Sequence, residues 1–311
     1  MLIQDIPSDS LTRRLRGAGV QLHTGAFATR IWAESATLAE QIAFMYAHHP
    51  YREDEPDIDD FRIKIAAPSL WRRWFRPQAQ IYIDGQTPFE PLEGHLGFPL
   101  MESSLNWSAA LGIYRYLILH AAVVERDGVG IVMPAPAGSG KSTLCAALAS
   151  QGWRLFSDEF ALIKHDDGRL LPNPRPISLK NEAIDVIADR APKACFSPRF
   201  DGTIKGTMCF LRPKREDVER MEEDCRLGFV VMPRFERGAE TRMETVDRIE
   251  AFLALTDNAV NYAGCQKLGF DGLTRVVEER PVYRLFHSDL DQAISLIETA
   301  HAQACEAAEA A

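Results

Sequence analysis

Short alternating runs of apolar and polar residues characterise the first hundred positions of the chain. Residues 61–66 and 79–83 alternate with a period of two and predict strands. Residues 20–31 read as extended segments around a glycine turn, whereas residues 37–47 have the apolar spacing of an amphipathic helix. We therefore expect residues 1–110 to form a smaller α+β region ahead of the main fold.

The pattern changes in the second third of the chain. It predicts a helix from Trp107 through His120, followed by two short β-branched runs at 121–125 and 130–133. An Asp-Gly pair lies between these runs and is a strong signal for a two-residue hairpin turn. The second run leads into a glycine-rich loop, and residues 142–150 read as the helix that follows it.

The remaining residues alternate between strand and helix patterns. The predicted elements are strands at 153–157, 160–164, 229–233 and 283–287, and helices at 249–261 and from the capping-box-like Ser288-Asp289-Leu290-Asp291 onward. This alternation is typical of an α/β protein. We expect one α/β core over residues 111–311, ending in a C-terminal helix.

The composition and net charge of the chain exclude some classes of binding partner. The 311 residues are 46% hydrophobic and 25% charged, with a net charge of -9, which argues against general nucleic-acid binding and against an anionic membrane surface. The six cysteines are scattered without a CxxC pair, a usage typical of reduced cytoplasmic thiols. The first residues show no secretory signal pattern, and no apolar stretch is long enough to span a bilayer. We expect a cytoplasmic protein.

The strongest motif is the loop Ala-Pro-Ala-Gly-Ser-Gly-Lys-Ser-Thr at 135–143. It matches the phosphate-binding (Walker A) pattern GxxxxGK[ST] except at Ala135, which we expect to adopt a conformation usually given to glycine. Its glycines let backbone N–H groups turn toward a phosphate, and the following helix presents its positive end to the anion. Lys141 can neutralise the β/γ oxygens and Ser142 can bind Mg²⁺. The predicted nucleotide contacts are Ala137, Gly138, Ser139, Gly140, Lys141, Ser142 and Thr143.

An acidic pair, Asp158-Glu159, follows the very next predicted strand. A GTPase or a motor ATPase would place its magnesium-linked aspartate at the end of a more distant hydrophobic strand. Phosphoryl transfer needs one carboxylate near the metal and another that orients and deprotonates the acceptor hydroxyl. We assign Asp158 to the metal or the base, and Glu159 to the base or a supporting role, and leave that choice open.

These features together resemble the catalytic domain of HPr kinase/phosphorylase, a serine kinase family whose core is similar to phosphoenolpyruvate carboxykinase. The family order is a histidine, a short hairpin, a GKS loop, a helix, and then glycine, a basic residue and an acidic pair. The matching residues, within 120–163, are His120, Gly140-Lys141-Ser142, Gly152-Trp153-Arg154-Leu155 and Asp158-Glu159. A weaker match stands at Ala259-Val260-Asn261-Tyr262.

Two departures separate the chain from that family. Glu159 stands where the family has a second aspartate, and the later glycine-rich signature is not recognisable. Residues 174–182 and 202–207 look more like a bacterial subgroup called HPr kinase-related kinases, which the chain also resembles in length.

The resemblance implies an HPr kinase/phosphoenolpyruvate carboxykinase-like P-loop core that uses ATP (or GTP) and Mg²⁺. It implies metal contacts at Ser142 and Asp158, and a His120 that holds the acidic pair or touches the γ-phosphate. It also implies transfer to a serine hydroxyl of a peptide or protein acceptor. HPr kinases form hexamers, so a homo-oligomer is expected by analogy.

Several other polar residues have two interpretations. Four cations could form a second shell around the triphosphate or be ordinary surface charges: Arg175, Lys180, Lys205 and Arg212. Asn258 and Asn261 could be polar site residues or satisfied core amides. The basic aromatic run at 71–76 could be a domain surface with its aromatics turned inward, or a docking patch for an acidic peptide or partner protein.

Three functions are compatible with these motifs. The first is a kinase acting on a peptide or protein hydroxyl, and the second is a small-molecule kinase built on the same core. The third is a nucleotide-dependent binding protein with little catalysis, which the intact Lys141, Ser142 and acidic pair disfavour. An open groove leading to the γ-phosphate would favour the first function, and a closed pocket the second.

Overall fold

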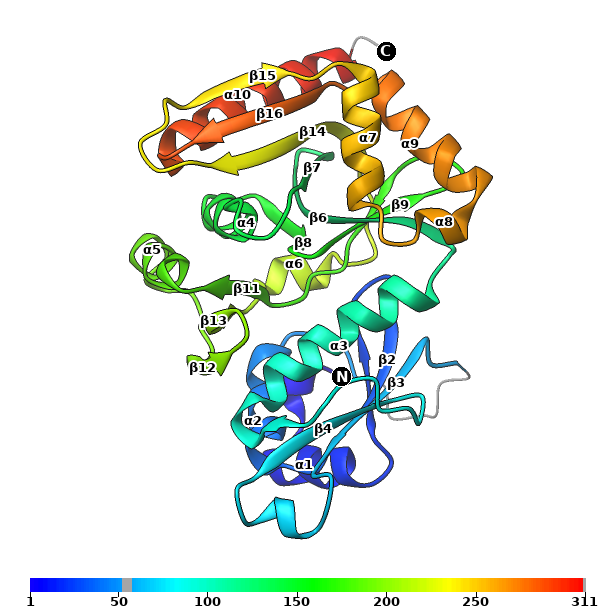
Figure 1. Ribbon diagram of the computed structural model, residues 1–311, viewed down its shortest axis with the longest axis vertical. Helices are drawn as coiled ribbons and strands as arrows, with labels where there is room; N and C mark the ends of the chain where they lie inside the picture. The colour runs from blue at the N-terminus through cyan, green and yellow to red at the C-terminus, as the bar shows by residue number, and fades with distance from the viewer. Residues whose placement is uncertain (52–57, 310–311) are drawn as a thin grey trace.

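The computed structural model describes residues 1–51 and 58–309 as a mixed α/β architecture (Figure 1). The helices are η1 Ile3–Asp5, α1 Ser8–Arg16, α2 Ala36–Met45, η2 Trp71–Arg73, η3 Gly94–Leu96, α3 Gly97–Gly112, α4 Lys141–Ser150, α5 Glu182–Arg190, α6 Arg215–Glu219, α7 Arg248–Asn258, α8 Tyr262–Cys265, α9 Lys267–Glu279 and α10 Leu290–Glu309. The strands are β1 Val20–His23, β2 Ala28–Ala33, β3 Phe61–Ala66, β4 Gln78–Ile83, β5 Leu92–Glu93, β6 Tyr116–Arg126, β7 Val129–Pro134, β8 Arg154–Ser157, β9 Phe160–Lys164, β10 Leu170–Leu171, β11 Ile177–Lys180, β12 Phe200–Thr203, β13 Gly206–Leu211, β14 Arg226–Phe235, β15 Arg242–Thr245 and β16 Val282–His287. Within the described residues the strands form three sheets.

A five-stranded sheet in the order β1-β2-β3-β4-β5 builds the N-terminal part. Along β3 the side chains alternate, so that Phe61, Ile63 and Ile65 are buried while Arg62 and Lys64 are exposed. The buried face joins a hydrophobic core with apolar residues of α1, α2 and α3. The helices therefore cover one face of this sheet, and the face that carries Arg62 and Lys64 remains open to solvent.

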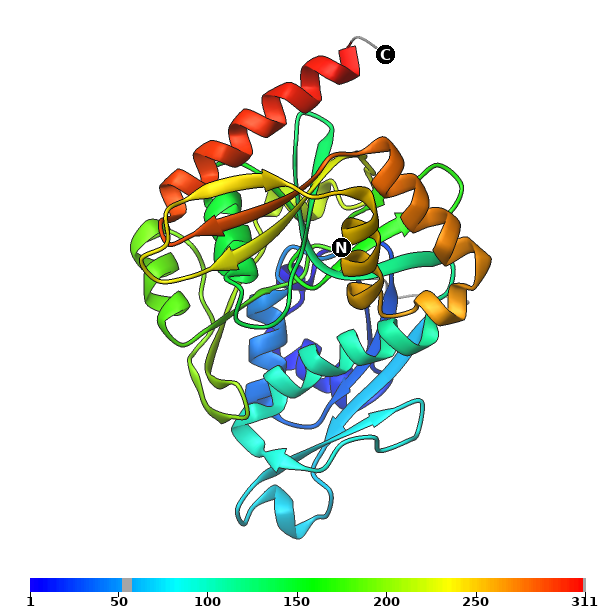
Figure 2. The ribbon, with the colours of Figure 1, turned by 45° about the horizontal axis from the view of Figure 1, so that its top comes forward.

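A larger sheet follows in the order β10-β9-β6-β7-β14-β16-β15, with β8 also paired to β6. Strand β14 runs parallel to β7 and β16, whereas β6 and β7 form the antiparallel hairpin predicted from the Asp-Gly pair. Ala122 and Val124 pack toward α4 and α10, and their neighbours Ala121 and Val123 pack toward α7 and α9. Helices thus cover both faces of this sheet, as Figures 1 and 2 show.

A small antiparallel sheet, β11-β13-β12, joins the two larger units. Met208 and Phe210 of β13 belong to the N-terminal core, while Cys209 and Leu211 belong to the core beneath α4 and α5. Because successive side chains of a strand point to opposite faces, a single strand contributes to both cores. In Figure 1 this sheet and α3 lie at the boundary between the N-terminal part and the larger sheet.

The helix predicted from Trp107 through His120 is wrong in its second half. Helix α3 ends at Gly112, and His120 lies in strand β6. Strands flank β6 on both edges and helices cover both of its faces. A strand buried in this way reads as a continuous apolar run, which periodicity alone does not distinguish from a buried helix.

Most other predicted elements are confirmed, with shifts of a few residues at their ends. The last helix is capped differently from the prediction. The Asp289 carboxylate accepts hydrogen bonds from the N–H groups of Asp291 and Gln292, whereas the Ser288 hydroxyl donates to the carbonyl of Ala239. In the described ranges, none of the helices combines the length and apolar character needed to cross a bilayer.

The aromatic side chains of the segment 71–76 do not turn inward, so that interpretation is wrong. Trp71, Trp74 and Phe75 are 67%, 83% and 51% exposed. The segment forms η2 and the turn after it, between β3 and β4, and lies in the cyan loop at the bottom of Figure 1. Its Arg73 is paired with Glu34. The segment therefore presents aromatic and basic groups to solvent.

Asn261 is a structural amide that anchors the start of β6. Its Oδ1 accepts the N–H of Ile118 at 2.9 Å, and its Nδ2 donates to the carbonyls of Ile113 and Tyr116 at 2.9 and 2.8 Å. The side chain is buried between α7 and α8, and all of these partners are main-chain groups. The structure places Asn261 among the satisfied core amides.

We expect Asn261→Ala to lower the free energy of unfolding by about 2–4 kcal/mol, because it leaves several buried main-chain groups unpaired. Urea denaturation of the variant and its parent measures this difference. Asn258→Ala is the matched control, since the Asn258 side chain donates to one main-chain carbonyl among the described residues, that of Ala254. Equal losses in the two variants would contradict the anchoring role.

Candidate functional site

The glycine-rich loop, residues 135–140, connects β7 to α4 at the centre of the larger sheet. Gly138 and Gly140 have φ values of 86° and 85°, in the left-handed region that favours glycine. A Cβ atom on Gly140 would lie 3.2 Å from the Cβ of Phe235 and 3.4 Å from Nε2 of His287. Glycine is therefore required there by backbone conformation and by close packing.

Ala135 does not carry the conformation expected of it. It is buried and is not among the residues with positive φ. The left-handed turns fall at the two glycines nearer the helix, so alanine fits at the start of the loop without strain. At the other end, the carbonyl of Ser139 accepts the N–H of Phe235 at 3.0 Å, which ties the loop to β14.

Lys141 connects the loop to the acidic pair. It is the first residue of α4 and is largely buried. Its Nζ donates to the main-chain carbonyl of Asp158 at 3.1 Å and lies 3.2 Å from Nε2 of His120. The amine is thus held between three elements, α4, β6 and the bend after β8. A cation in this position lies next to any anion that the loop N–H groups bind.

Asp158 lies at the bend between β8 and β9 and points into the protein. Its Oδ2 accepts the N–H of Ser178 at 3.1 Å, while its Oδ1 is buried without a partner among the described residues. Burial raises the pKa of Asp158, and the positive charge of Lys141 and the hydroxyl of Ser142 act in the opposite direction. A buried carboxylate that lies close to the Ser142 hydroxyl and has one oxygen without a partner among the described residues offers the donor chemistry that a hard divalent cation prefers.

The Glu159 carboxylate lies near His120 and not, like Asp158, near Ser178. One of its oxygens lies 3.5 Å from Nε2 of His120. Burial alone would raise the pKa of Glu159, but the His120 contact and the charges of Lys141 and Lys180 outweigh burial and lower the pKa to about 2. The Ser157 hydroxyl accepts the N–H of Glu159 and holds the sharp bend. The two neighbouring carboxyls therefore differ. Burial raises the pKa of Asp158, whereas the contacts of Glu159 keep it ionised.

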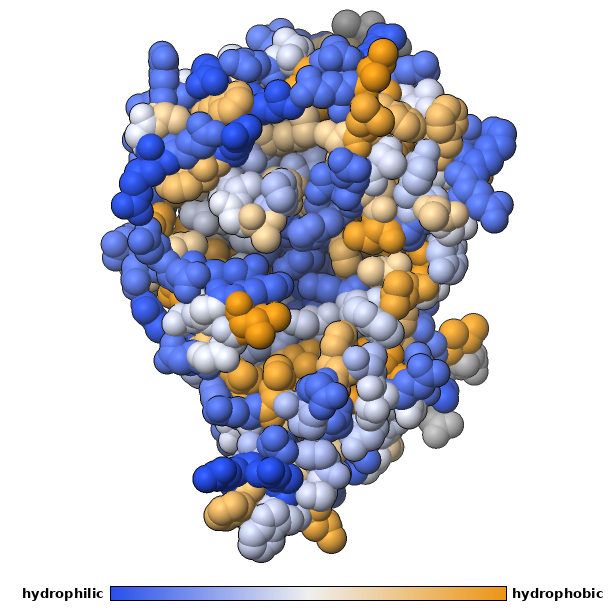
Figure 3. Space-filling view, viewed as in Figure 1, coloured by the Kyte–Doolittle hydropathy of each residue, from blue (hydrophilic) through white to orange (hydrophobic). Residues whose placement is uncertain are grey.

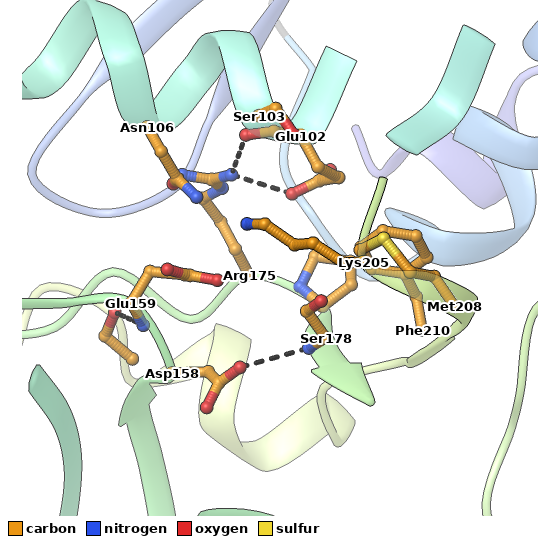
Figure 4. Close-up of a pocket in the computed structure, with 12 residues that line it drawn as sticks. Glu102, Ser103, Asn106, Asp158, Glu159, Arg175, Ser178, Lys205, Met208 and Phe210 are labelled. Carbon is orange, nitrogen blue, oxygen red and sulfur yellow. Dashed lines mark hydrogen bonds and ion pairs between the residues drawn. The ribbon is translucent and has the colours of Figure 1, made fainter. Parts of the chain in front are cut away.

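A small cavity of about 30 Å³ opens beside this acidic pair. Figure 3 shows that the face between the N-terminal part and the larger sheet is hollowed and lined mainly by hydrophilic residues. The cavity walls come from α3, from the segment 175–178 and from the β12–β13 hairpin. Figure 4 shows Asp158 at one side of the cavity and Lys205 reaching in from the other.

The four cations considered for contact with the triphosphate occupy different places. Arg175 is buried and pairs with Glu102 of α3 at 2.7 Å, so it connects two segments of the cavity wall. Lys205 lines the cavity, and Lys180 is close enough to Glu159 to lower the pKa of that carboxyl. Arg212 donates to the carbonyl of Phe44 at the end of α2 and lies outside the cavity lining.

Three residues near the site had no signal in the sequence. Ser178 holds Asp158 through its backbone N–H, which any residue type could supply. Glu102 meets Arg175 across 73 positions of sequence. His287 is buried beside Gly140 and both of its ring nitrogens lack a partner among the described residues. Only long-range packing brings these groups to the site.

One comparison with known proteins matches the segment that carries the loop and the acidic pair. Residues 106–178 match the family model described as "SynChlorMet cassette protein ScmC". This segment runs from the last turns of α3 through the loop and the acidic pair to Ser178. A search of curated proteins found no match.

Among solved structures, the chain is similar to the Hpr(Ser) kinase/phosphatase from Coxiella burnetii. The sequence identity is 15% and the TM-score is 0.27, over 62% of this chain and 98% of that one.

Proposed function

We propose that the chain is a Mg²⁺-dependent kinase that transfers the γ-phosphate of ATP (or GTP) to a serine hydroxyl of a peptide or protein. The observation that carries the proposal is the position of Lys141. It directly follows Gly140, the second of two left-handed glycines, and holds its amine between His120 and the backbone of Asp158. An HPr kinase-like core is part of the same proposal.

The loop and α4 would hold the nucleotide. Backbone N–H groups of residues 137–143 and the N-terminal end of α4 would surround the phosphates, and Lys141 would leave its protein partners for the β/γ oxygens. Ser142 and Asp158 would hold Mg²⁺, which would neutralise phosphate charge when bound. The unpartnered Oδ1 of Asp158 supports this assignment.

Glu159 would position the acceptor. Its carboxylate is ionised and lines the cavity, so it would accept a hydrogen bond from the acceptor hydroxyl. In the transfer, the hydroxyl oxygen forms a bond to the γ-phosphorus while the bond from that phosphorus to the β,γ-bridging oxygen breaks. The nucleoside diphosphate leaves with that electron pair, and Glu159 takes the hydroxyl proton. His120 would keep the Glu159 carboxylate oriented.

The open face of the N-terminal sheet supports a polypeptide acceptor. A groove on this face is lined by aromatic and basic side chains, among them Trp32, Tyr82, Arg62 and Lys64. The exposed segment 71–76 follows β3 of the same sheet. Aromatic and basic groups together suit an acidic or extended chain, and these lie on a protein of net charge -9.

The test adds labelled ATP and the protein to lysate of its source cells and identifies the labelled species. We expect a labelled polypeptide. Arg72→Glu combined with Trp74→Ala should reduce its labelling while the rise in melting temperature with Mg-ATP stays unchanged. The pair avoids Arg73, which is already engaged in an ion pair with Glu34.

The matched control is Arg248→Glu combined with Ile249→Ala, an exposed arginine and an exposed apolar residue at the start of α7. It should label the polypeptide at the parent rate. A second candidate, a small-molecule kinase, is favoured by the walls that close around the cavity on three sides. Label that appears only on small molecules would establish that alternative and reject the protein kinase.

A further inference from the structure

The cavity beside Glu159 has chemically different walls. On one side lie the two carboxylates, and on the other lie Lys205, Ser103 and Asn106. We infer that the acceptor carries an anionic group, a carboxylate or a phosphate, close to its hydroxyl, and that this second wall binds it. The inference rests on the proposed function and specifies the substrate class of the same site.

Lys205 supplies the positive charge. Figure 4 shows its side chain extending into the cavity. Within the described residues, no hydrogen bond or ion pair engages its amine, although its backbone is fixed. The Lys205 N–H donates to Thr203 Oγ1 at 3.1 Å, and its carbonyl accepts from Asn181 Nδ2 at 3.4 Å. Gly206 closes the turn at φ 87°, where a Cβ would lie 2.3 Å from Asn181 Oδ1. A defined turn therefore aims an uncompensated ammonium group at the cavity.

Asn106 adds a donor to the same wall. Its Oδ1 accepts from the Arg175 guanidinium at 2.8 Å. Because arginine can only donate, this bond fixes the amide orientation and leaves the Asn106 NH₂ group as the free end. In the part of the chain that the structure describes, that NH₂ group has no acceptor. The Ser103 hydroxyl, one turn before Asn106 on α3, can donate as well.

The acidic groups of the cavity are already engaged or face the other way. Glu102 is neutralised by Arg175 at 2.7 Å and also accepts the Tyr46 hydroxyl. Asp158 and Glu159 belong to the wall where the metal and the acceptor hydroxyl are proposed to bind. The unoccupied polar groups of the far wall are thus an ammonium, an amide NH₂ and a hydroxyl. Such a donor set recognises an oxyanion.

Two sources could present this chemistry. One is a serine in a polypeptide with an acidic neighbour, and the other is a free hydroxy acid. Both place an oxyanion a few bonds from the hydroxyl, which suits two opposite walls of one small cavity. The acceptors in the test are chosen to distinguish them.

The test measures kcat/KM for phosphate transfer from labelled Mg-ATP to two pairs of acceptors. The first pair is a serine peptide with glutamates beside the serine and the same peptide with lysines there. The second pair is glycerate and glycerol. We expect the parent protein to prefer the anionic member of one pair by about tenfold or more. Preference in the first pair identifies a polypeptide source, and in the second a free hydroxy acid.

Lys205→Ala should lower transfer to the preferred anionic acceptor by about tenfold and abolish the preference, and Lys205→Glu should shift it toward the lysine peptide or glycerol. The melting-temperature rise with Mg-ATP should be retained in both. Lys193→Ala, at another exposed lysine, is the control and should match the parent.

Equal rates within both pairs, no transfer to either anionic acceptor, or parent-like rates in Lys205→Ala would overturn the inference while Mg-ATP binding persists. Absence of any Mg-ATP effect in the parent would instead reject the proposed kinase function, and this inference with it.

Discussion

Replacing Lys141 with methionine should remove most of the stabilisation that Mg-ATP gives the protein. A charge-assisted phosphate contact contributes about 1.5–3 kcal/mol, so nucleotide binding should weaken by about 10- to 100-fold. Methionine retains an apolar stem in a position that is largely buried, and this limits the structural damage. The measurement is the rise in melting temperature over a series of Mg-ATP concentrations, analysed by linkage.

Two controls separate binding from folding in this experiment. The melting temperature of each protein without nucleotide reports the loss of the Lys141 contacts to His120 and Asp158. Lys193→Met changes an exposed lysine outside the loop and should leave the Mg-ATP effect intact. If Lys141→Met shows the full parental rise, the nucleotide does not bind at the loop.

Replacing Glu159 with glutamine should slow phosphate transfer by about 10²–10⁴-fold while nucleotide binding stays nearly intact. The side chain faces the cavity and is ionised, so its proposed task is to orient the acceptor hydroxyl and take its proton. Asp158→Asn should behave differently, because it removes the proposed metal ligand. We expect it to lower nucleotide affinity and Mg²⁺ dependence together. Initial rates and Mg-ATP melting shifts, measured over a Mg²⁺ titration, distinguish the two.

Glu222→Gln is a matched control, since Glu222 is an exposed glutamate outside the cavity lining. It should have parental rates and parental binding. If Glu159→Gln loses nucleotide binding and Asp158→Asn retains it, the two roles are reversed. If both variants transfer phosphate at the parental rate, the proposed mechanism is wrong.

The sequence by itself predicted the features that local rules control. The Asp127-Gly128 turn is one example, since both residues adopt positive φ and join β6 to β7 as expected. The loop between β7 and α4 is another, because glycine spacing and the helix start are encoded within a few residues. The bend that carries Asp158 and Glu159 follows from two short strand patterns separated by an acidic pair.

Tertiary structure decided what depends on distant partners. It made the segment around His120 a strand, because flanking strands and helices on both faces buried a run whose periodicity was ambiguous. It also distinguished the neighbouring carboxyls, since Ser178 holds Asp158 in the interior while His120 faces Glu159. Burial and pairing set these differences, and both depend on residues brought from elsewhere in the chain.

The cavity gives the clearest example of what the sequence predicts and what only packing decides. Arg175 and Lys205 were both visible as cations in the sequence, but not which of them would be neutralised. Glu102, on a helix of the N-terminal region, pairs with Arg175, whereas no ion pair within residues 1–51 and 58–309 engages Lys205. The residue types came from the sequence, and their chemical state came from the packing of α3 against the core, because a charge acts according to the groups that surround it.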